Sequence, residues 1–130
     1  MSKVHAKNDG THFVTNISNS NLSLIADLPL ASGGTNSGFS PIDLLASALA
    51  ACTAMFITDY CKKHNYVIFG VDVDVIVESN DDESQTHFIR DIKIQGNISQ
   101  DLKNEVFEAA KSCHLHNILS GNISIQSNLR

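Results

Sequence analysis

The stretch Gly38-Phe39-Ser40-Pro41-Ile42-Asp43-Leu44-Leu45-Ala46-Ser47-Ala48-Leu49-Ala50-Ala51-Cys52-Thr53 predicts the start of a long helix. Ser40 is suited to cap it, and Pro41 to occupy its first position. Asp43 falls in the first turn, where the helix macrodipole favours a negative charge. From there to about His64 the apolar residues recur at helical spacing, and the opposite side is small rather than charged. We therefore expect a helix that is buried nearly all round.

On the amino-terminal side of this helix, the pattern predicts short strands and a loop. Within residues 1–27, the segments 12–15 and 22–26 favour strands and are bounded by turn-forming residues, which is typical of a three-stranded meander. Residues 29–39 are rich in Gly and Ser and predict a flexible loop. The part from Ala31 to Gly38 is interpreted either as a lid over Cys52 or as a solvated connection.

On the carboxyl-terminal side, the pattern predicts a long hairpin and a second helix. Residues 67–77 and 87–96 each alternate apolar and polar positions, with a turn at 80–84 between them. Ser99 is a candidate cap for the second helix, which should carry Cys113 at its carboxyl end. A last short strand is expected at 123–125. This order of elements is α+β, in one domain that covers residues 1–130.

Composition excludes several classes of protein. The chain has 130 residues, 42% hydrophobic and 18% charged, which is ordinary for a globular domain. Its net charge of −5 and the lack of a basic run argue against nucleic-acid binding. The longest apolar stretch, within 42–57, contains polar residues and is short for a membrane span, so we expect a soluble protein and no membrane partner. The amino terminus lacks the pattern of a secretory signal, which predicts a cytoplasmic location.

The three cysteines, Cys52, Cys61 and Cys113, do not form a disulfide framework, because their number is odd and the cytoplasm is reducing. The run 113–116 contains possible metal ligands, but no Cys-x2-Cys pair accompanies it, so no metal is predicted. Cys52, in the middle of an apolar helix, is interpreted as an inert core residue or as a nucleophile. At a helix carboxyl end, Cys113 would have its thiol pKa raised by the dipole, although nearby histidines oppose this. Cys61 is interpreted as a bystander near the exposed end of the long helix.

Two blocks of sequence resemble the OsmC/Ohr family. In the first, a Ser-Pro loop opens a long helix, and Cys52 follows Pro41 by eleven residues, as does the first reactive cysteine of the family. The second block, residues 110–119, resembles the family's second cysteine motif, Cys-Pro-Val-His followed by a leucine. Cys113 and His116 match this motif, while His114 replaces its proline.

The resemblance implies an OsmC-like fold of antiparallel sheets with two helices, in an intertwined homodimer. It also implies a site at the subunit interface that acts without metal or organic cofactor. Cys52 would be oxidised by a hydroperoxide, preferably an organic one, to a sulfenic acid, and Cys113 would resolve it as a disulfide that an external dithiol then reduces.

The chain departs from the peroxidase branches of the family, which use an arginine near the amino terminus paired with a glutamate after the helix-opening proline. Ile42 occupies the glutamate position, and no arginine precedes Arg90. Asp43 resembles the acidic residue of a less-characterised branch, or is simply a first-turn helix residue. The sequence does not decide which cation would replace this arginine. The candidates are Lys3, Lys7, Arg90 and the histidines.

His116 is a candidate to orient or protonate Cys113, or else caps a helix end. The missing arginine favours a second hypothesis, a protein of the same fold that acts in thiol–disulfide exchange or binds a small apolar ligand at the dimer interface.

Overall fold

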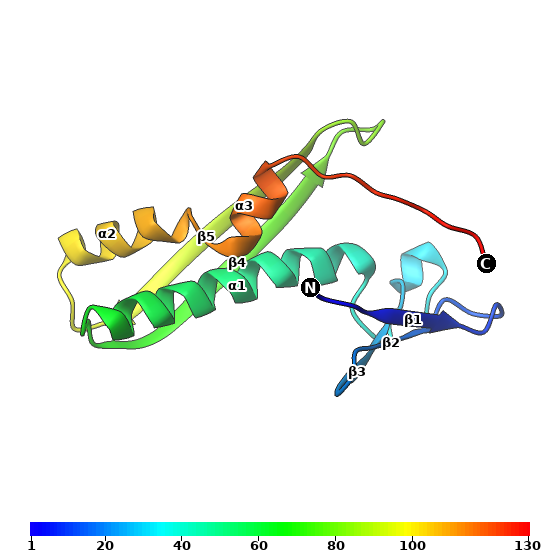
Figure 1. Cartoon of the computed structure of the whole chain (residues 1–130), viewed down its shortest axis with the longest axis horizontal. Coiled ribbons are helices and arrows are strands. Elements are labelled where there is room, and N and C mark those ends of the chain that lie inside the picture. The colour runs from blue at the N-terminus through cyan, green and yellow to red at the C-terminus, as the bar shows by residue number, and fades with distance from the viewer. The chain divides into compact units, whose positions relative to one another are not determined.

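The computed structural model describes all 130 residues, which divide into two compact units, residues 1–45 and 46–130. Figure 1 shows the strands and helices of each unit, and the units are described separately below. The predicted α+β class is confirmed, with antiparallel sheets in both units. A single domain over residues 1–130 stays a prediction.

The first unit contains the predicted three-stranded antiparallel meander, β1 (His5–Asn8), β2 (Thr15–Ser18) and β3 (Ser23–Ala26). The expected strand at 12–15 is wrong in its bounds, because residues 12–14 belong to the β1–β2 connection. The side chain of Asn8 donates to the carbonyl of His12 at 2.8 Å, and Asp9 accepts from the backbone N–H of Thr11 at 2.9 Å. These local bonds close a turn where sequence pattern alone indicates a strand.

The loop that follows β3 is held by one carboxylate, contrary to the flexible loop that we expected. Asp27 is only 2% exposed and accepts hydrogen bonds from the Thr35 hydroxyl at 2.6 Å and from the backbone N–H groups of Leu28, Thr35 and Ser37. These bonds, the Thr35 hydroxyl first and the Ser37 N–H next, hold the pKa of Asp27 well below its usual range. A short 3-10 turn, η1 (Leu30–Ser32), lies within the loop.

The long helix α1 (Pro41–Lys63) begins where the sequence predicts. The hydroxyl of Ser40 accepts from the backbone N–H of Asp43 at 3.2 Å, as a helix cap does. The expectation of burial nearly all round is wrong for a single chain. Burial is confined to one i, i+4 stripe, while apolar residues elsewhere on α1, such as Met55, are exposed. The stripe consists of Leu49, Thr53, Ile57 and Cys61.

The predicted hairpin is confirmed as β4 (Ile68–Ser79) and β5 (Thr86–Gly96). In the register, Val73 lies opposite Ile92, and Val75 lies opposite Arg90. Residues directly opposite each other share one face of an antiparallel pair, and residues two apart on a strand share it as well. Arg90 therefore lies on the same face as Val73 and Ile92, which is the largely apolar one.

The helix α2 (Gln100–Ala110) and α1 pack on this face of the hairpin. Ser99 caps α2, as predicted, by accepting from the N–H of Leu102 at 3.2 Å. The buried core consists of Ile57 and Cys61 from α1 with Val106 and Ala110 from α2, and partly buried residues of both strands pack against it.

The carboxyl-terminal part differs from the prediction in two ways. The second helix ends at Ala110, and Cys113 instead precedes a third helix, α3 (His114–Ser120). Residues 121–130 form no strand, so the strand expected at 123–125 is absent. Ile123 and Ile125 are 61% and 89% exposed, and no neighbouring strand pairs with this segment to satisfy its backbone.

By length and composition alone, α1 is apolar enough to cross a membrane, with a mean hydropathy of 1.6 in its most apolar window. The core helix of a soluble protein meets the same criterion. The packing of α1 against α2 and the hairpin agrees with a role in the core of the second unit.

Candidate functional site

The second unit brings four residues from three elements around one sulfur atom, Sγ of Cys113. Arg90 Nη1 of β5 lies 3.7 Å from this sulfur, and Thr53 Oγ1 of α1 lies 3.9 Å from it. The thiol of Cys52, next to Thr53 on α1, is close enough to contribute as a hydrogen-bond donor to the lowered pKa of Cys113. His116 completes the group from α3, through its backbone N–H at 3.4 Å. All three cysteines are free thiols.

The local backbone places Cys113 at the amino end of α3, where its sulfur accepts the N–H of His116 as a cap acceptor does. The expectation that a helix carboxyl end raises the thiol pKa is therefore wrong. Burial of Cys113 does raise its pKa. Hydrogen bonds from the His116 N–H, Thr53 and Cys52, together with the positive charge of Arg90, outweigh burial and lower the pKa below the ordinary value for a thiol.

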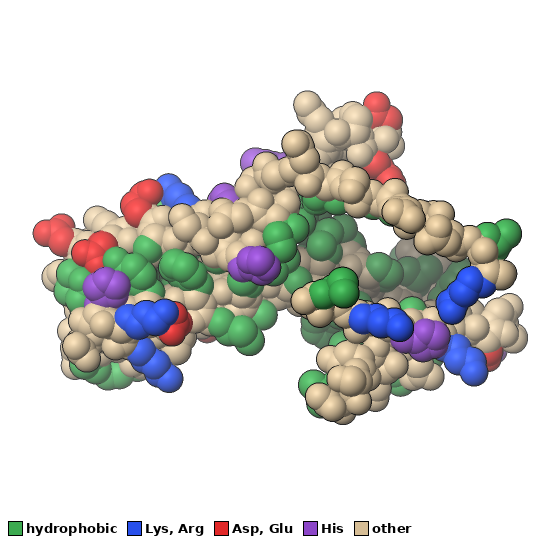
Figure 2. Space-filling model, viewed as in Figure 1, with side chains coloured by type: hydrophobic (Ala, Val, Ile, Leu, Met, Phe, Trp, Pro, Cys, Tyr) green, Lys and Arg blue, Asp and Glu red, His purple; other side chains and the backbone are tan.

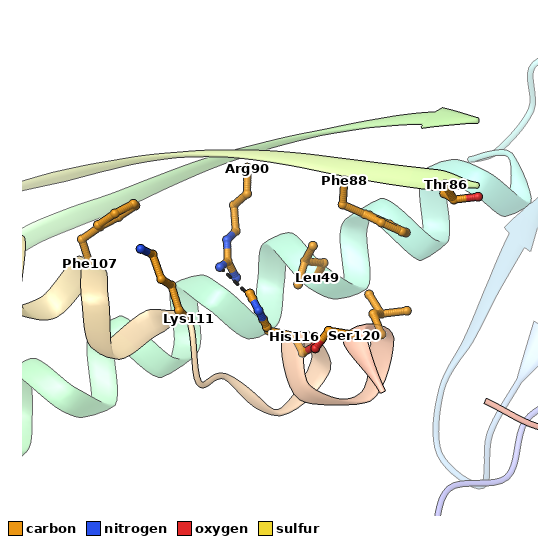
Figure 3. Close-up of a pocket in the computed structure, with 9 residues that line it drawn as sticks. Leu49, Thr86, Phe88, Arg90, Phe107, Lys111, His116 and Ser120 are labelled. Atoms are coloured by element: carbon orange, nitrogen blue, oxygen red, sulfur yellow. Dashed lines mark hydrogen bonds between the residues drawn. The ribbon is translucent and has the colours of Figure 1, made fainter. Parts of the chain in front are cut away.

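Arg90 connects the sulfur to two other polar groups. Its Nη1 donates to Thr53 Oγ1 at 3.0 Å, and its Nη2 donates to Nδ1 of His116 at 3.0 Å, the bond drawn in Figure 3. A guanidinium has no acceptor atom, so Nδ1 of His116 must accept, and the proton of the neutral imidazole resides on Nε2. His116 therefore has an N–H available for a ligand.

Thr53 forms two hydrogen bonds. Its hydroxyl donates to the carbonyl of Leu49, one turn earlier on α1, at 2.7 Å, and its oxygen accepts from Arg90. The residue is fully buried, on the apolar stripe of α1. The bond to Thr53 thus helps to hold the guanidinium of Arg90 beside Sγ of Cys113.

A cavity of about 430 Å³ lies beside this group, within the second unit. Figure 3 shows Phe107 and Phe88 on either side of Arg90 along the cavity, with His116 facing Arg90 from α3. The volume is in the range of small-molecule sites. The cavity therefore combines apolar walls with hydrogen-bond donors from Arg90 and His116. Its lining residues are Leu49, Thr86, Phe88, Arg90, Phe107, Lys111, His116, Leu119 and Ser120.

Of the predicted site residues, the structure brings Cys52, Cys113 and His116 together. Asp43 lies in the first turn of α1, nine residues before Cys52, which corresponds to a rise of about 13 Å along a helix. Any role for Asp43 stays a prediction. Cys61 is 1% exposed in the core, not near an exposed end as expected, and burial raises the pKa of its thiol. Its position in the core agrees with the bystander interpretation.

The sequence leaves Arg90 as one of several possible cations and does not single out Thr53, although both residues carry a signal. Arg90 interrupts the apolar alternation between Phe88 and Ile92, and an arginine on the inward face of a strand is a functional signal. Thr53 is a hydroxyl on a helix stripe that is otherwise apolar. Among the cations that the sequence left open, Arg90 is the one in contact with a cysteine.

The model of the OsmC-like protein family matches residues 34–128, so the chain belongs to this family. An OsmC-like protein of Mycoplasma pneumoniae has the same fold at 19% identity, with a TM-score of 0.80 over 93% of this chain and 88% of that one. A Psychrobacter arcticus protein, described as a candidate osmotic-stress-induced and detoxification-response protein, is 22% identical with a TM-score of 0.77 over 91% and 88% of the chains.

The organic hydroperoxide resistance protein OhrB of Bacillus subtilis is 19% identical, with a TM-score of 0.66 over 94% of this chain and 92% of that one. The family thus includes organic hydroperoxide resistance proteins as well as proteins of unknown function. No curated protein sequence matches the chain.

Proposed function

We propose that this protein is a thiol-dependent reductase of organic hydroperoxides in which Cys52 and Cys113 cycle between two thiols and a disulfide. The observation that carries the proposal is that these two free thiols are neighbours, with Arg90 beside Cys113. Two neighbouring thiols are the arrangement that a sulfenic acid needs for rapid resolution.

The reaction begins at Cys52. Its thiolate attacks the terminal oxygen of the hydroperoxide, the O–O bond breaks, and the remaining alkoxide takes up a proton to become an alcohol. The product is the sulfenic acid of Cys52. His116 supports this step as a hydrogen-bond donor to the departing oxygen, because its Nε2–H is not used by Arg90.

Cys113 then resolves the sulfenic acid. Its thiolate attacks Sγ of Cys52, the S–O bond breaks, and hydroxide leaves and becomes water with the proton that Cys52 lost. An external dithiol returns both cysteines to thiols and is itself oxidised to a disulfide. A reducing cytoplasm supplies such a dithiol, and the chemistry requires no metal or organic cofactor.

The lining of the cavity favours an organic hydroperoxide over hydrogen peroxide as the substrate. Its walls include Leu49, Phe88, Phe107 and Leu119, which favour an apolar substituent, while Arg90 and His116 supply the polar end. An alkyl or aryl hydroperoxide gains from burying its apolar part here, and hydrogen peroxide has no such part.

Members of this family are typically homodimers, and we propose that this chain is one as well. Figure 2 shows hydrophobic side chains at the surface, and α1 exposes Ile42, Leu45 and Met55 by 50%, 38% and 70%. A second copy that covers α1 would restore the all-round burial that its composition predicts. Sedimentation of the purified protein tests this point.

The function is tested by consumption of cumene hydroperoxide and of hydrogen peroxide with dithiothreitol as the reductant. We expect the wild type to turn over, with cumene hydroperoxide preferred, and Cys52→Ser to be inactive. In the absence of reductant, Cys113→Ser should consume one equivalent of hydroperoxide and accumulate the sulfenic acid of Cys52, because this variant has no resolving thiol. Cys61→Ala is the matched control, since its sulfur lies in the core, and it should keep the wild-type rate.

A wild type that consumes no hydroperoxide would contradict the proposal. The second hypothesis, thiol–disulfide exchange, then gains support if the wild type reduces a small disulfide substrate and Cys52→Ser does not. The absence of the family's usual arginine and glutamate pair near the amino terminus is the observation that keeps this alternative in the experiment.

A further inference from the structure

The two thiols of the pair differ in access. Sγ of Cys113 belongs to a residue that is 0% exposed, whereas Cys52 is partly exposed. Within one chain, Cys52 is therefore the more accessible of the two thiols. In a disulfide between the two, the accessible sulfur would be that of Cys52, because the other lies behind Thr53, Arg90 and His116.

The two thiols also differ in charge environment. Arg90 is partly buried and forms no ion pair with a carboxylate, since the ion pairs of the chain are Lys63–Asp59 and Lys111–Glu108. A guanidinium that is withdrawn from water is stabilised by a counter-charge. The acidic group that Arg90 contacts is the thiol of Cys113, at 3.7 Å.

Two further donors are directed at the same sulfur. The backbone N–H of His116 lies 3.4 Å from it and is fixed by the start of α3. The hydroxyl of Thr53, at 3.9 Å, can rotate from the Leu49 carbonyl toward the sulfur when the sulfur carries a negative charge. Each of these interactions is stronger with a thiolate than with a thiol.

We propose that the Cys52–Cys113 disulfide is opened in one direction, by attack of the external thiolate on Sγ of Cys52 and departure of Cys113 as a thiolate held by Arg90. Arg90 is then a positioning residue that acts through Cys113. This inference rests on the proposed disulfide cycle and specifies its reductive half.

The chemistry balances as two exchanges. The first thiolate of the dithiol forms a bond to Sγ of Cys52, the Cys52–Cys113 bond breaks, and Cys113 keeps the electron pair. The second thiol of the reductant then loses its proton and attacks the reductant's other sulfur, which is bonded to Cys52 in the mixed disulfide. Cys52 leaves as a thiolate and takes up a proton. The dithiol loses two electrons, and the protein disulfide gains them. A lower leaving-group pKa and better access to the attacked sulfur both accelerate such exchange.

The direction is tested by locating the mixed disulfide. The disulfide is first formed with diamide, so that the experiment is independent of activity toward hydroperoxide. The oxidised protein is mixed with 2-mercaptoethanol, quenched with acid, alkylated, and mapped by mass spectrometry. We expect mercaptoethanol on Cys52 and the alkyl group on Cys113. Mercaptoethanol on Cys113, or on both cysteines equally, would overturn the inference, as would failure of diamide to form the disulfide.

The role of Arg90 is tested with Arg90→Met, Arg90→Lys and the matched control Lys93→Met, which removes an exposed cation from the same strand. Reduction of the diamide-formed disulfide by dithiothreitol should slow about tenfold in Arg90→Met, as expected for loss of one charge-assisted contact. Arg90→Lys should retain most of the wild-type rate of reduction, and Lys93→Met should retain all of it. An unchanged rate in Arg90→Met contradicts the assignment.

The two proposals fail in different ways. A wild type without hydroperoxide turnover refutes the proposed function but leaves the mapping experiment intact. Turnover with mercaptoethanol on Cys113 refutes the direction and leaves the function standing.

Discussion

The guanidinium of Arg90 lies 3.7 Å from Sγ of Cys113, on a strand face that is otherwise largely apolar. The register places Arg90 opposite Val75, so this cation is directed at the helices and not at solvent. Its hydrogen bonds to Thr53 and His116 fix it in this position. Of the three cysteines, Cys113 is therefore the one whose sulfur contacts a cation.

Ionisation of Cys113 should precede that of Cys61 as pH rises. The pKa of Cys113 is lowered and that of Cys61 is raised, so thiolate forms at Cys113 below the ordinary range and at Cys61 above it. The ultraviolet absorbance of thiolate in the Cys52→Ser variant should therefore increase in two separate steps. The double variant Cys52→Ser with Cys113→Ser should lose the step at lower pH. Retention of that step would contradict the assignment.

Replacement of Thr53 by valine should destabilise the second unit. The change keeps the shape of the side chain but removes the oxygen that accepts from Arg90 at 3.0 Å. A buried donor without its partner costs about 1–3 kcal/mol of unfolding free energy. Thr58→Val, at an exposed position of the same helix, is the control and should change stability by no more than about 0.5 kcal/mol. Urea denaturation measures both, and equal losses would argue against a role for the Thr53 hydroxyl.

The carboxylate of Asp27 should stabilise the first unit in a pH-dependent manner. Its folded pKa lies below the unfolded value, so the stabilisation is complete above about pH 4 and is lost as pH falls further. At neutral pH, Asp27→Asn should lower the melting temperature, because the amide replaces one oxygen that accepts from Thr35 and Ser37 with a donor. The difference between wild type and variant should shrink in acid. Asp81→Asn, in an exposed turn, serves as the control, and a difference that is constant with pH would contradict the account.

The core between α1 and α2 should respond strongly to truncation. Ile57 is 0% exposed and packs with Cys61, Val106 and Ala110. Ile57→Ala should reduce the free energy of unfolding by about 2–5 kcal/mol, through lost burial and the cavity left behind. Leu129→Ala, at a fully exposed position near the carboxyl terminus, should have little effect. Denaturant titration of the two variants provides the comparison.

Much of the fold follows from local signals in the sequence. The start of α1 at Ser40-Pro41, the cap of α2 at Ser99 and the alternation in β4 and β5 each depend on neighbouring residues, and each is confirmed. The break between α2 and α3 is less visible, because residues 110–120 remain compatible with one continuing helix. It depends on Cys113, a residue not usual as a cap, which accepts the N–H of His116.

The candidate site is less predictable, since it depends on contacts between residues that are distant in sequence. Cys113 meets Thr53 across 60 positions and Arg90 across 23, and neither meeting is encoded in spacing. Family resemblance indicated Cys52, Cys113 and His116. The identity of the cation required the register of β4 with β5, which places residue 90 on the inward face.

The placement of Arg90 on β5 also affects how the sequence can vary. The groups within hydrogen-bonding distance of Sγ of Cys113 come from α1, β5 and the start of α3. Substitutions at Thr53, Arg90 and His116 are therefore coupled, because each of them changes the ionisation of the same buried thiol.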